Sequence, residues 1–303
     1  RSSYSMARLL LAYFTCVRRC KYSGEEENMY TKFNYSPAGS FYNQVINRHL
    51  EHGRAIYKSH EEEVQDCLSR YITEDGVING TALKEHWFSI SKKNVFISHS
   101  HDDIYKVIAF AGWLHEAFGL EAFIDSCSWG YCDDLLKRID KRYCYKRETH
   151  TYDYDMRNYT TSHVHMMLST ALTEMMYNTE CIIFFNTPQS INMASELAKI
   201  KKDKKQTTIS PWIYHELSMT TMLGVVKPHR LSPALEHRDH VDFSQSTHDE
   251  KPKFDYDVSK ALNEMTTLTD RQLQQWYERH IDNPNIPSEY ALDELYRITF
   301  PNK

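Results

Sequence analysis

The sequence predicts an α/β fold with an open parallel sheet flanked by helices, because short strand-like runs alternate with longer amphipathic stretches. The first two strand-like runs are Asn94–Ser98 and Glu121–Asp125. A third run, Cys181–Phe185, is apolar throughout, which is typical of a strand buried on both faces of a parallel sheet.

Helices are expected between these strands. Apolar residues recur at helical spacing from Ile104 to Phe118, and Gly119 suits the end of that helix. Ser100 and Asp103 have the spacing of a capping box at its start. Helical spacing returns from Asp133 to Tyr143 and over Val164–Met175, whereas the polar, tyrosine-rich stretch between them, Tyr143–Tyr159, is expected to be a loop.

A further helix is predicted to start at Ser210-Pro211, which have the residue types preferred at the N-cap and first helical positions. Trp212 and Glu216 follow four residues apart and therefore share one face of that helix. Beyond Gly224 we expect a late strand within Lys253–Val258 and a helix over Asp270–Ile281.

These patterns divide the chain into three parts. Residues 1–91 are predicted to be a mostly helical N-terminal extension with a regulatory or oligomerisation role, since no chemistry-bearing motif is found there. Residues 92–285 are predicted to form the α/β domain, and residues 286–303 a C-terminal tail.

Charge and hydropathy argue against nucleic-acid and membrane proteins. The net charge is −5 without a basic stripe, so a nucleic-acid partner is not expected. The one prominent basic run, Lys199–Lys205, is either a solvated loop or a contact for a pyrophosphate or an acidic partner. The apolar run Leu9–Phe14 is far shorter than the roughly 20 residues that span a bilayer, and basic residues follow it at once, unlike in a signal peptide. We expect a cytoplasmic protein with no membrane partner.

Cysteine, histidine and glycine spacing exclude several kinds of site. Seven cysteines at irregular spacing argue against a disulfide framework and for a reducing compartment. No metal is expected, because Cys16 and Cys20 have no matching second pair and His163 and His165 point to different helix faces. The glycines form neither a dinucleotide fingerprint nor a P-loop, so a nucleotide must be held in another way.

The candidate site lies where the predicted strands end. In open α/β sheets, ligands bind beyond the carboxyl ends of the strands. Small polar residues follow all three predicted strands, and Ser126–Tyr131 is predicted to be a loop that could close over a ligand, with Trp129 stacking on a ring. The expected substrate-binding residues are Ser98, His99, Ser100, Asp125, Ser126, Trp129, Asn186, Thr187 and Trp212, beside Glu216 as the catalytic carboxylate.

Three motifs resemble those of bacterial Toll/interleukin-1 receptor (TIR) domains. The run Val95–Asp103 is similar to their first strand and loop, and Phe123–Ser126 with Trp129-Gly130 to their second. Ser210-x-Trp212-x-x-x-Glu216-Leu217 is similar to the motif that carries the catalytic glutamate of TIR enzymes. The resemblance covers about residues 92–225, and the long lysine-rich run before Ser210 departs from the family pattern.

The resemblance implies a flavodoxin-like TIR fold and an enzyme of antiphage defence of the Thoeris type. Such an enzyme splits NAD⁺, as substrate rather than cofactor, at the nicotinamide–ribose bond and makes a nucleotide signal for a separate effector. It also implies a homo-oligomer, assembled through the TIR and N-terminal regions, so that the purified protein is expected to look inactive until it assembles. Two alternatives stay open: a non-enzymatic TIR scaffold, and an enzyme like the nucleoside deoxyribosyltransferases.

Overall fold

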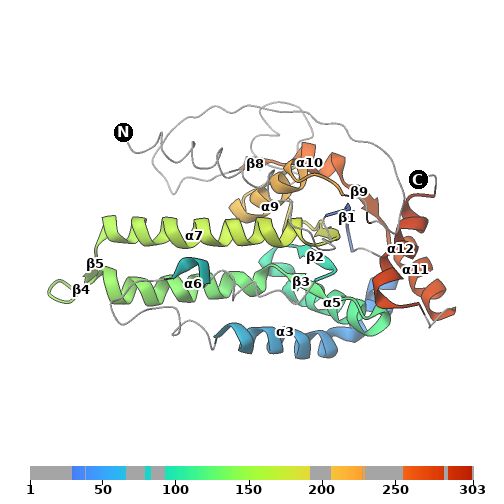
Figure 1. The fold of residues 1–303 in the computed structure, drawn as a ribbon, viewed down its shortest axis with the longest axis horizontal. Helices are drawn as coiled ribbons and strands as arrows, with labels where there is room; N and C mark the ends of the chain where they lie inside the picture. Colours follow the sequence, from blue (N-terminus) through green and yellow to red (C-terminus); the bar gives the residue numbers. More distant parts are fainter. Residues whose placement is uncertain are drawn as a thin grey trace.

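The computed structural model places helices on both faces of one central sheet (Figure 1). The residues that it describes are 29–37, 39–65, 79–82, 93–191, 206–226, 228, 255–282 and 286–301. The lysine-rich run 199–205 and the pair Cys16 and Cys20 lie outside these residues, so their predicted roles stay predictions.

The central sheet has five strands, and every pair in it is parallel. The three strands expected from the sequence are present, and the predicted α/β fold with a parallel sheet is confirmed. The architecture is consistent with a flavodoxin-like fold. In sheet order the strands are β3 (Ala122–Ile124), β2 (Val95–Ser98), β6 (Cys181–Phe185), β1 (Thr31–Tyr35) and β9 (Thr266–Leu268).

The structure corrects the prediction that residues 1–91 lie outside the sheet as a helical extension. β1 lies between β6 and β9, with Phe33 opposite both Ile183 and Thr266. Its residues alternate between buried and half-buried, which is the pattern of a strand with helices on both sides. The α/β domain therefore begins well before residue 92.

The position of β1 completes a doubly wound strand order. Doubly wound sheets commonly have the strand order 2-1-3-4-5, in which the numbers follow the chain. If β2 is counted as the first strand, β3 is the second and β6 the third, and their places in the sheet match this order. The fourth place belongs to β1, which precedes all of them in the chain, and the fifth to β9. The strand order reverses between β2 and β6, so this is the point at which a ligand is expected.

One face of the sheet is covered by helices from both ends of the chain. They are α2 (Ser40–Gln44), α3 (Leu50–Gln65), α5 (Ile104–Phe118), α11 (Asp270–Asp282) and α12 (Ser288–Thr299). Aromatic side chains fill this core: the rings of Phe118 and Trp276 stack with centroids 3.8 Å apart, and Trp113 meets Trp276 edge-on. The helix predicted over 270–281 is confirmed as α11.

α12 corrects the prediction of a C-terminal tail over residues 286–303. Ala291, Leu292 and Leu295 are buried in the core of this face. The indole Nε1 of Trp276 also donates a hydrogen bond to the carbonyl of Ala291 at 2.9 Å. The segment is thus part of the folded unit.

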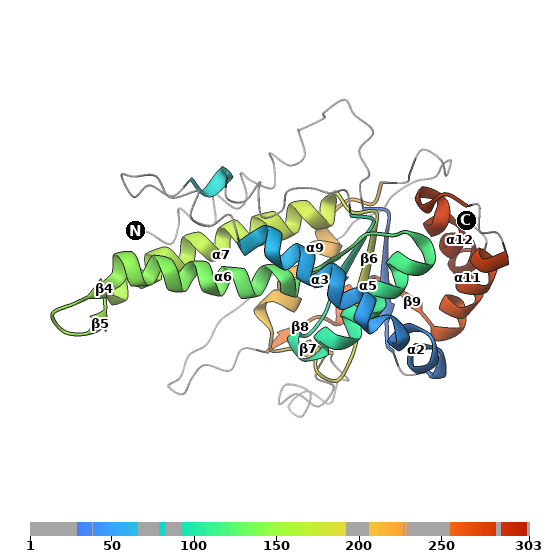
Figure 2. The same ribbon diagram turned by 90° about the horizontal axis from the view of Figure 1, so that it is seen from below.

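The other face is covered by α6 (Ser126–Ile139), α7 (Tyr154–Tyr177), α9 (Pro211–Met222) and α10 (Ser259–Glu264). α6 and α7 run side by side and extend beyond the sheet (Figure 2). A π-helical turn, Asp140–Cys144, and a hairpin of β4 (Tyr145–Lys146) and β5 (Thr151–Tyr152) join them at the tip. The predicted late strand is confirmed as β8 (Tyr256–Asp257), which pairs with β7 (Thr207–Thr208) in a small separate sheet.

Two predicted loops are wrong. Ser126–Tyr131 forms the first turns of α6, because packing of α6 along α7 overrides the weak helix propensity of its serines and glycine. Tyr143–Tyr159 contains the hairpin and the start of α7, where the side chain of Asp153 accepts a hydrogen bond from the backbone N–H of Met156.

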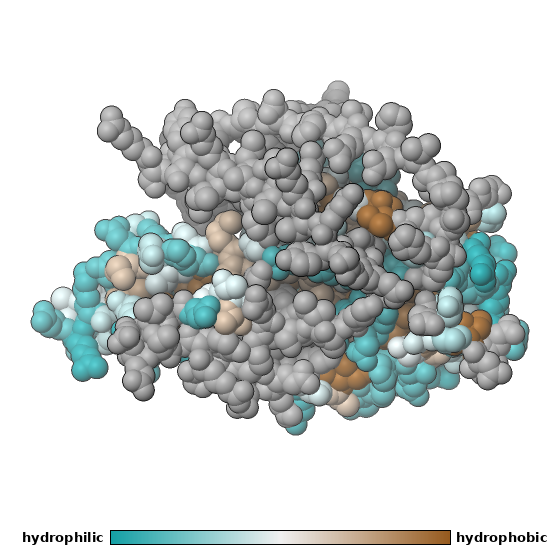
Figure 3. Space-filling view, viewed as in Figure 1, coloured by the Kyte–Doolittle hydropathy of each residue, from teal (hydrophilic) through white to brown (hydrophobic). Residues whose placement is uncertain are grey.

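Hydrophilic residues cover the tip of the α6–α7 pair and the outer side of α11 and α12 (Figure 3). Among the helices that the structure describes, none combines the length and the apolar character needed to cross a bilayer.

Candidate active site

Glu216 lies at the carboxyl end of β2. Its Oε2 atom accepts a hydrogen bond from the hydroxyl of Ser98, the last residue of β2, at 2.5 Å. Only 1% of Glu216 is exposed. The predicted catalytic carboxylate and one predicted binding residue are therefore in direct contact, next to the point where the strand order reverses.

The sequence of α9 explains why this glutamate points inward. Ser210 caps the helix, as predicted, by accepting a hydrogen bond from the backbone N–H of Ile213. Ile213 and Leu217 are buried beside Phe184 of β6. Glu216 lies next to Leu217 and three residues after Ile213, so the helix that buries these apolar residues turns Glu216 toward the sheet as well.

Burial raises the pKa of Glu216 well above its usual range, and the nearby negative charge of Asp125 raises it further. The hydrogen bond from Ser98 favours the ionised form and acts in the opposite direction. Burial and Asp125 therefore favour the protonated form of Glu216, and Ser98 opposes them.

Asp125 and His99 form a second contact in the same place. Asp125 follows β3 and His99 follows β2, and the Nδ1 atom of His99 lies 2.6 Å from Oδ1 of Asp125. The side chains are 0% and 3% exposed. The N–H direction is not aligned for a hydrogen bond, so this is a close polar contact. Sequence reasoning named both residues but gave no signal that they would pair.

Several buried polar atoms of this cluster lack hydrogen-bond partners among the described residues. Besides Nδ1 of His99, they are Nε2 of His99 and Oγ of Ser126, whereas the carboxyl groups of Glu216 and Asp125 hydrogen-bond to each other. Buried polar atoms are usually hydrogen-bonded, and exceptions require an explanation such as a catalytic role or a ligand. An unpartnered imidazole and an unpartnered hydroxyl at the strand ends indicate a site arranged to receive polar groups of a ligand.

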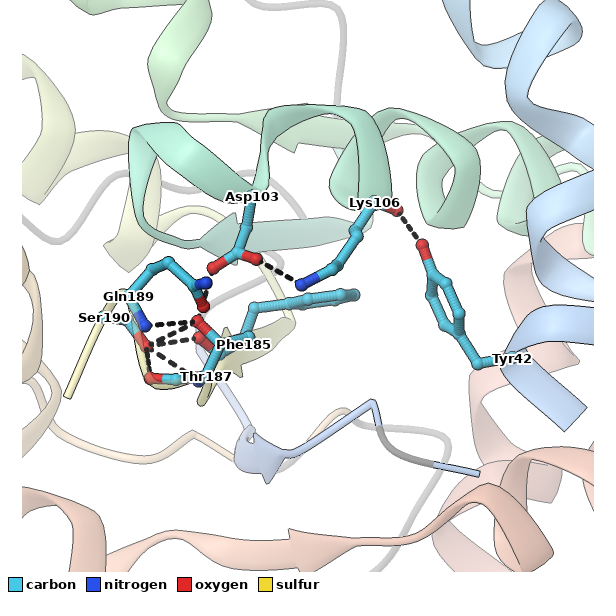
Figure 4. A network of polar contacts seen from close by, with 7 residues as sticks. All are labelled: Tyr42, Asp103, Lys106, Phe185, Thr187, Gln189 and Ser190. Atoms are coloured by element: carbon cyan, nitrogen blue, oxygen red, sulfur yellow. Dashed lines mark hydrogen bonds and ion pairs between the residues drawn. The ribbon is translucent and has the colours of Figure 1, made fainter. Parts of the chain in front are cut away.

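Thr187 and Asp103 belong to a separate network beyond the end of β6 (Figure 4). The Thr187 hydroxyl donates a hydrogen bond to Asp103, and the other oxygen of Asp103 lies 2.6 Å from Nζ of Lys106. Ser190 donates to the carbonyl of Phe185 and accepts from the backbone N–H of Thr187. The network fixes the loop after β6 against the start of α5.

The predicted capping box does not form. Ser100 is the N-cap of a short 3-10 turn, His101–Asp103, but its side chain makes no capping hydrogen bond. Asp103 instead contacts Thr187 and Lys106. The residue whose spacing from Ser100 suggested a helix cap therefore connects two loops. Asp103 was missed as a site residue for this reason.

The remaining predicted site residues, Trp212, Asn186 and Trp129, lie on α9, after β6 and on α6. Trp212 is half-buried, packs beneath α7 and meets His165 edge-on with ring centroids 5.5 Å apart, so it attaches α9 to α7. The backbone N–H of Asn186 donates to the carbonyl of Tyr35, which places Asn186 at the end of β1 and β6. Trp129 lies in α6, and its side chain is outside the described residues. The helical backbone there removes the loop on which its predicted lid role depended.

No group of three His, Cys, Asp or Glu side chains within the described ranges is arranged to hold a metal ion. The cluster around Glu216 offers two carboxyl groups, an imidazole and two hydroxyls, Ser98 and Ser126. Such a set can bind sugar hydroxyls, stabilise positive charge and accept a proton.

A scan against protein-family models found no matching family, and searches of curated proteins and of solved structures found no match either.

Proposed function

We propose that this protein cleaves the nicotinamide–ribose bond of NAD⁺, with Glu216 as the catalytic carboxylate, and makes a nucleotide signal from the ADP-ribosyl group. The support is one observation: a buried glutamate on α9 hydrogen-bonds to Ser98 at the carboxyl end of β2 and lies beside Asp125 at the end of β3. The TIR-like motif around Glu216 supports the same assignment.

The chemistry of the leaving group explains why one carboxylate suffices for this reaction. Most glycosidases need a general acid because their leaving group departs as an alkoxide. Nicotinamide leaves NAD⁺ as a neutral molecule, so no proton must be delivered to it. The ribose passes through a state that resembles an oxocarbenium ion, and an ionised Glu216 hydrogen-bonded to the ribose hydroxyls stabilises that positive charge.

The raised pKa of Glu216 fits a cationic substrate. The raised pKa reflects the cost of a negative charge buried beside Asp125. The nicotinamide ring of NAD⁺ carries a positive charge, and an opposite charge nearby favours ionisation of a carboxyl group. Substrate binding is therefore expected to favour the ionised, catalytic form of Glu216.

The pair of carboxyl groups favours a second candidate, glycosyl transfer on nucleosides. A nucleobase is a poorer leaving group than nicotinamide and requires an acid. Asp125 and Glu216 are buried together, and the charge of Asp125 favours the protonated form of Glu216, so one partner could act as acid while the other stabilises the sugar.

Product analysis separates these functions. The protein is incubated at high concentration, where assembly is favoured, with NAD⁺ or with 2′-deoxynucleosides, and the products are identified by mass spectrometry. We expect nicotinamide release from NAD⁺ and loss of it in Glu216→Gln. Base release from deoxynucleosides alone would favour the second candidate, and no release from either substrate would favour a non-enzymatic scaffold.

If the protein acts in antiphage defence, the product reaches a separate effector as a diffusible signal. We expect it to be a small nucleotide derived from ADP-ribose, and the protein to work as a homo-oligomer in the cytoplasm.

A further inference from the structure

We propose that His99, held by Asp125, is the general base that activates the acceptor in this reaction, and that the acceptor is an O–H group. This rests on the proposed function of Glu216 and assigns the step that follows departure of nicotinamide.

The contact with Asp125 defines which nitrogen of His99 is available. The lone pairs of a carboxylate oxygen and an unprotonated ring nitrogen 2.6 Å apart would repel each other, so Nδ1 is assigned the proton although its N–H does not point straight at Oδ1. In a neutral imidazole the other nitrogen, Nε2, then has a free lone pair. Nε2 is buried and has no hydrogen-bond partner within the part of the chain that the structure describes.

The same carboxylate connects His99 to the catalytic glutamate. Asp125 lies against His99, and its charge acts on Glu216. His99 also follows Ser98 directly, and Ser98 donates its hydroxyl to Glu216. The base and the carboxylate that stabilises the ribose cation are therefore anchored to the same two strand ends.

Enzymes activate hydroxyl groups with a chain of three contacting groups, in which a carboxylate orients a base and the base contacts the nucleophile. Here the nucleophile comes from the acceptor. The bond between C1′ of ribose and the nicotinamide nitrogen breaks, and its electron pair leaves with nicotinamide. The acceptor oxygen then bonds to C1′ while its proton passes to Nε2 of His99. Asp125 stabilises the resulting imidazolium, which later releases the proton to solvent.

The need for a base limits the acceptor class. A hydroxyl or water must lose its proton as the C–O bond forms, whereas a pyridine-type ring nitrogen attacks with a lone pair and has no proton to lose. A base at His99 thus favours capture by oxygen, from water or from a sugar hydroxyl, over capture by a ring nitrogen.

The test compares two capture reactions of the same enzyme. The protein is incubated with NAD⁺ alone, to measure capture by oxygen, and with added 3-acetylpyridine, to measure exchange of the nicotinamide ring by a nucleophile without a proton. Both reactions require Glu216, and only the first requires a base. Incubation in ¹⁸O-labelled water distinguishes hydrolysis from capture by a sugar hydroxyl.

In His99→Asn we expect capture by oxygen to fall about a hundredfold or more, the usual contribution of a general base, while exchange stays within a few-fold of the wild type. His52→Asn, on α3 at the opposite face of the sheet, is the matched control and should change neither reaction. An equal fall of both reactions in His99→Asn, or no fall in either, would overturn the assignment.

The wild type gives the same information without a substitution, should the variant fail to fold. Because the acceptor proton moves to Nε2 as the C–O bond forms, oxygen capture should slow in deuterium oxide while exchange does not, so the ratio of oxygen capture to exchange should decrease there. A ratio unchanged in deuterium oxide would overturn the role of His99 while leaving Glu216 as the catalytic carboxylate. Absence of nicotinamide release and of exchange would instead refute the proposed function, and the assignment with it.

Discussion

At the level of single residues, burial of Glu216 has a consequence for stability that activity does not report. A carboxyl group whose pKa is raised by folding stabilises the native state fully below its unfolded pKa, about 4.3. This contribution is lost as the pH rises through the folded pKa. Above the unfolded pKa the unfolded chain gives up the proton freely, whereas the native state must either keep the proton or hold a buried negative charge.

Glu216→Gln is therefore expected to be more stable than the wild type at neutral and alkaline pH. Glutamine keeps an acceptor for Ser98 and has no proton to lose. The difference in the free energy of unfolding should grow with pH above about 4.3, by at most about 1.4 kcal/mol per pH unit. Urea unfolding of both proteins between pH 4 and pH 9 measures it, and parallel curves would contradict the raised pKa.

Ser98→Ala should reduce activity through the ionisation of Glu216. The hydroxyl of Ser98 stabilises the ionised form, so its removal raises the pKa of Glu216 further. Hydrogen bonds to charged groups contribute about 1.5–3 kcal/mol, so we expect nicotinamide release at pH 7 to fall at least tenfold and its pH profile to move to higher pH.

Ser162→Ala provides the control for Ser98→Ala. The Ser162 hydroxyl donates only to the carbonyl of Asn158 in its own helix, α7, and is exposed. Its loss should leave the profile unchanged. A fall in rate in Ser98→Ala without a shift of the pH profile would argue that Ser98 acts on the substrate and not through Glu216.

The residues of this site could be predicted from the sequence, whereas the contacts between them could not. Glu216, Ser98, His99, Asp125 and Ser126 were all expected, since polar residues at strand ends and a carboxylate on the following helix are visible in the sequence. Their pairing was not, because the contact of His99 with Asp125 depends on the register of two strands. The role of Asp103 was hidden because its spacing from Ser100 suggested a helix cap.

At the level of elements, two glycines set the distance between α3 and α5. A Cβ atom at Gly112 would lie 2.5 Å from the carbonyl oxygen of His49 and 2.6 Å from the backbone nitrogen of Gly53. One at Gly53 would lie 2.0 Å from the carbonyl oxygen of Ile108. The two backbones are in direct contact, which only glycine permits.

Gly112→Ala is expected to destabilise the protein by about 3 kcal/mol, because the clash is with backbone that cannot rotate away. This exceeds the gain of about 1 kcal/mol that alanine normally brings to a helix. Gly224→Ala, where no atom lies within 4 Å of the added Cβ, is the matched control. A melting temperature for Gly112→Ala at or above that of the control would show that α3 does not pack there.

Helices and strands with strong internal patterns were predicted well, and segments defined by their partners were not. β6 and α9 were expected at or within a residue of their observed bounds. α6 begins inside a predicted loop, because its packing along α7 outweighs local propensity. β1 is short and half polar, and its neighbours in the sheet come from residues far away in the chain, so its sequence carries little signal.

At the level of the whole molecule, the position of β1 ties the N-terminal residues to the site. β1 pairs with β6 along its full length and separates it from β9. β6 in turn pairs with β2, whose end carries Ser98 and precedes His99. The sheet that holds the site therefore depends on residues that sequence reasoning had assigned to a separate extension.

Removal of residues 1–91 is accordingly expected to abolish the fold. The truncated chain would lack the strand between β6 and β9, together with α2 and α3, and would expose the aromatic core of that face. Circular dichroism and thermal unfolding of the truncated protein check this. A cooperative transition like that of the full chain would restore the idea of an independent regulatory extension.

The most direct test of the account is the rate of nicotinamide release from NAD⁺ with enzyme in excess, compared between the wild type and Glu216→Gln at pH 7. Because Glu216→Gln is expected to be at least as stable as the wild type, a loss of activity would not reflect unfolding. We expect at least a 100-fold lower rate in Glu216→Gln, or ~3 kcal/mol of lost transition-state stabilisation. Equal rates in the two proteins, or no release by the wild type at any protein concentration, would contradict it.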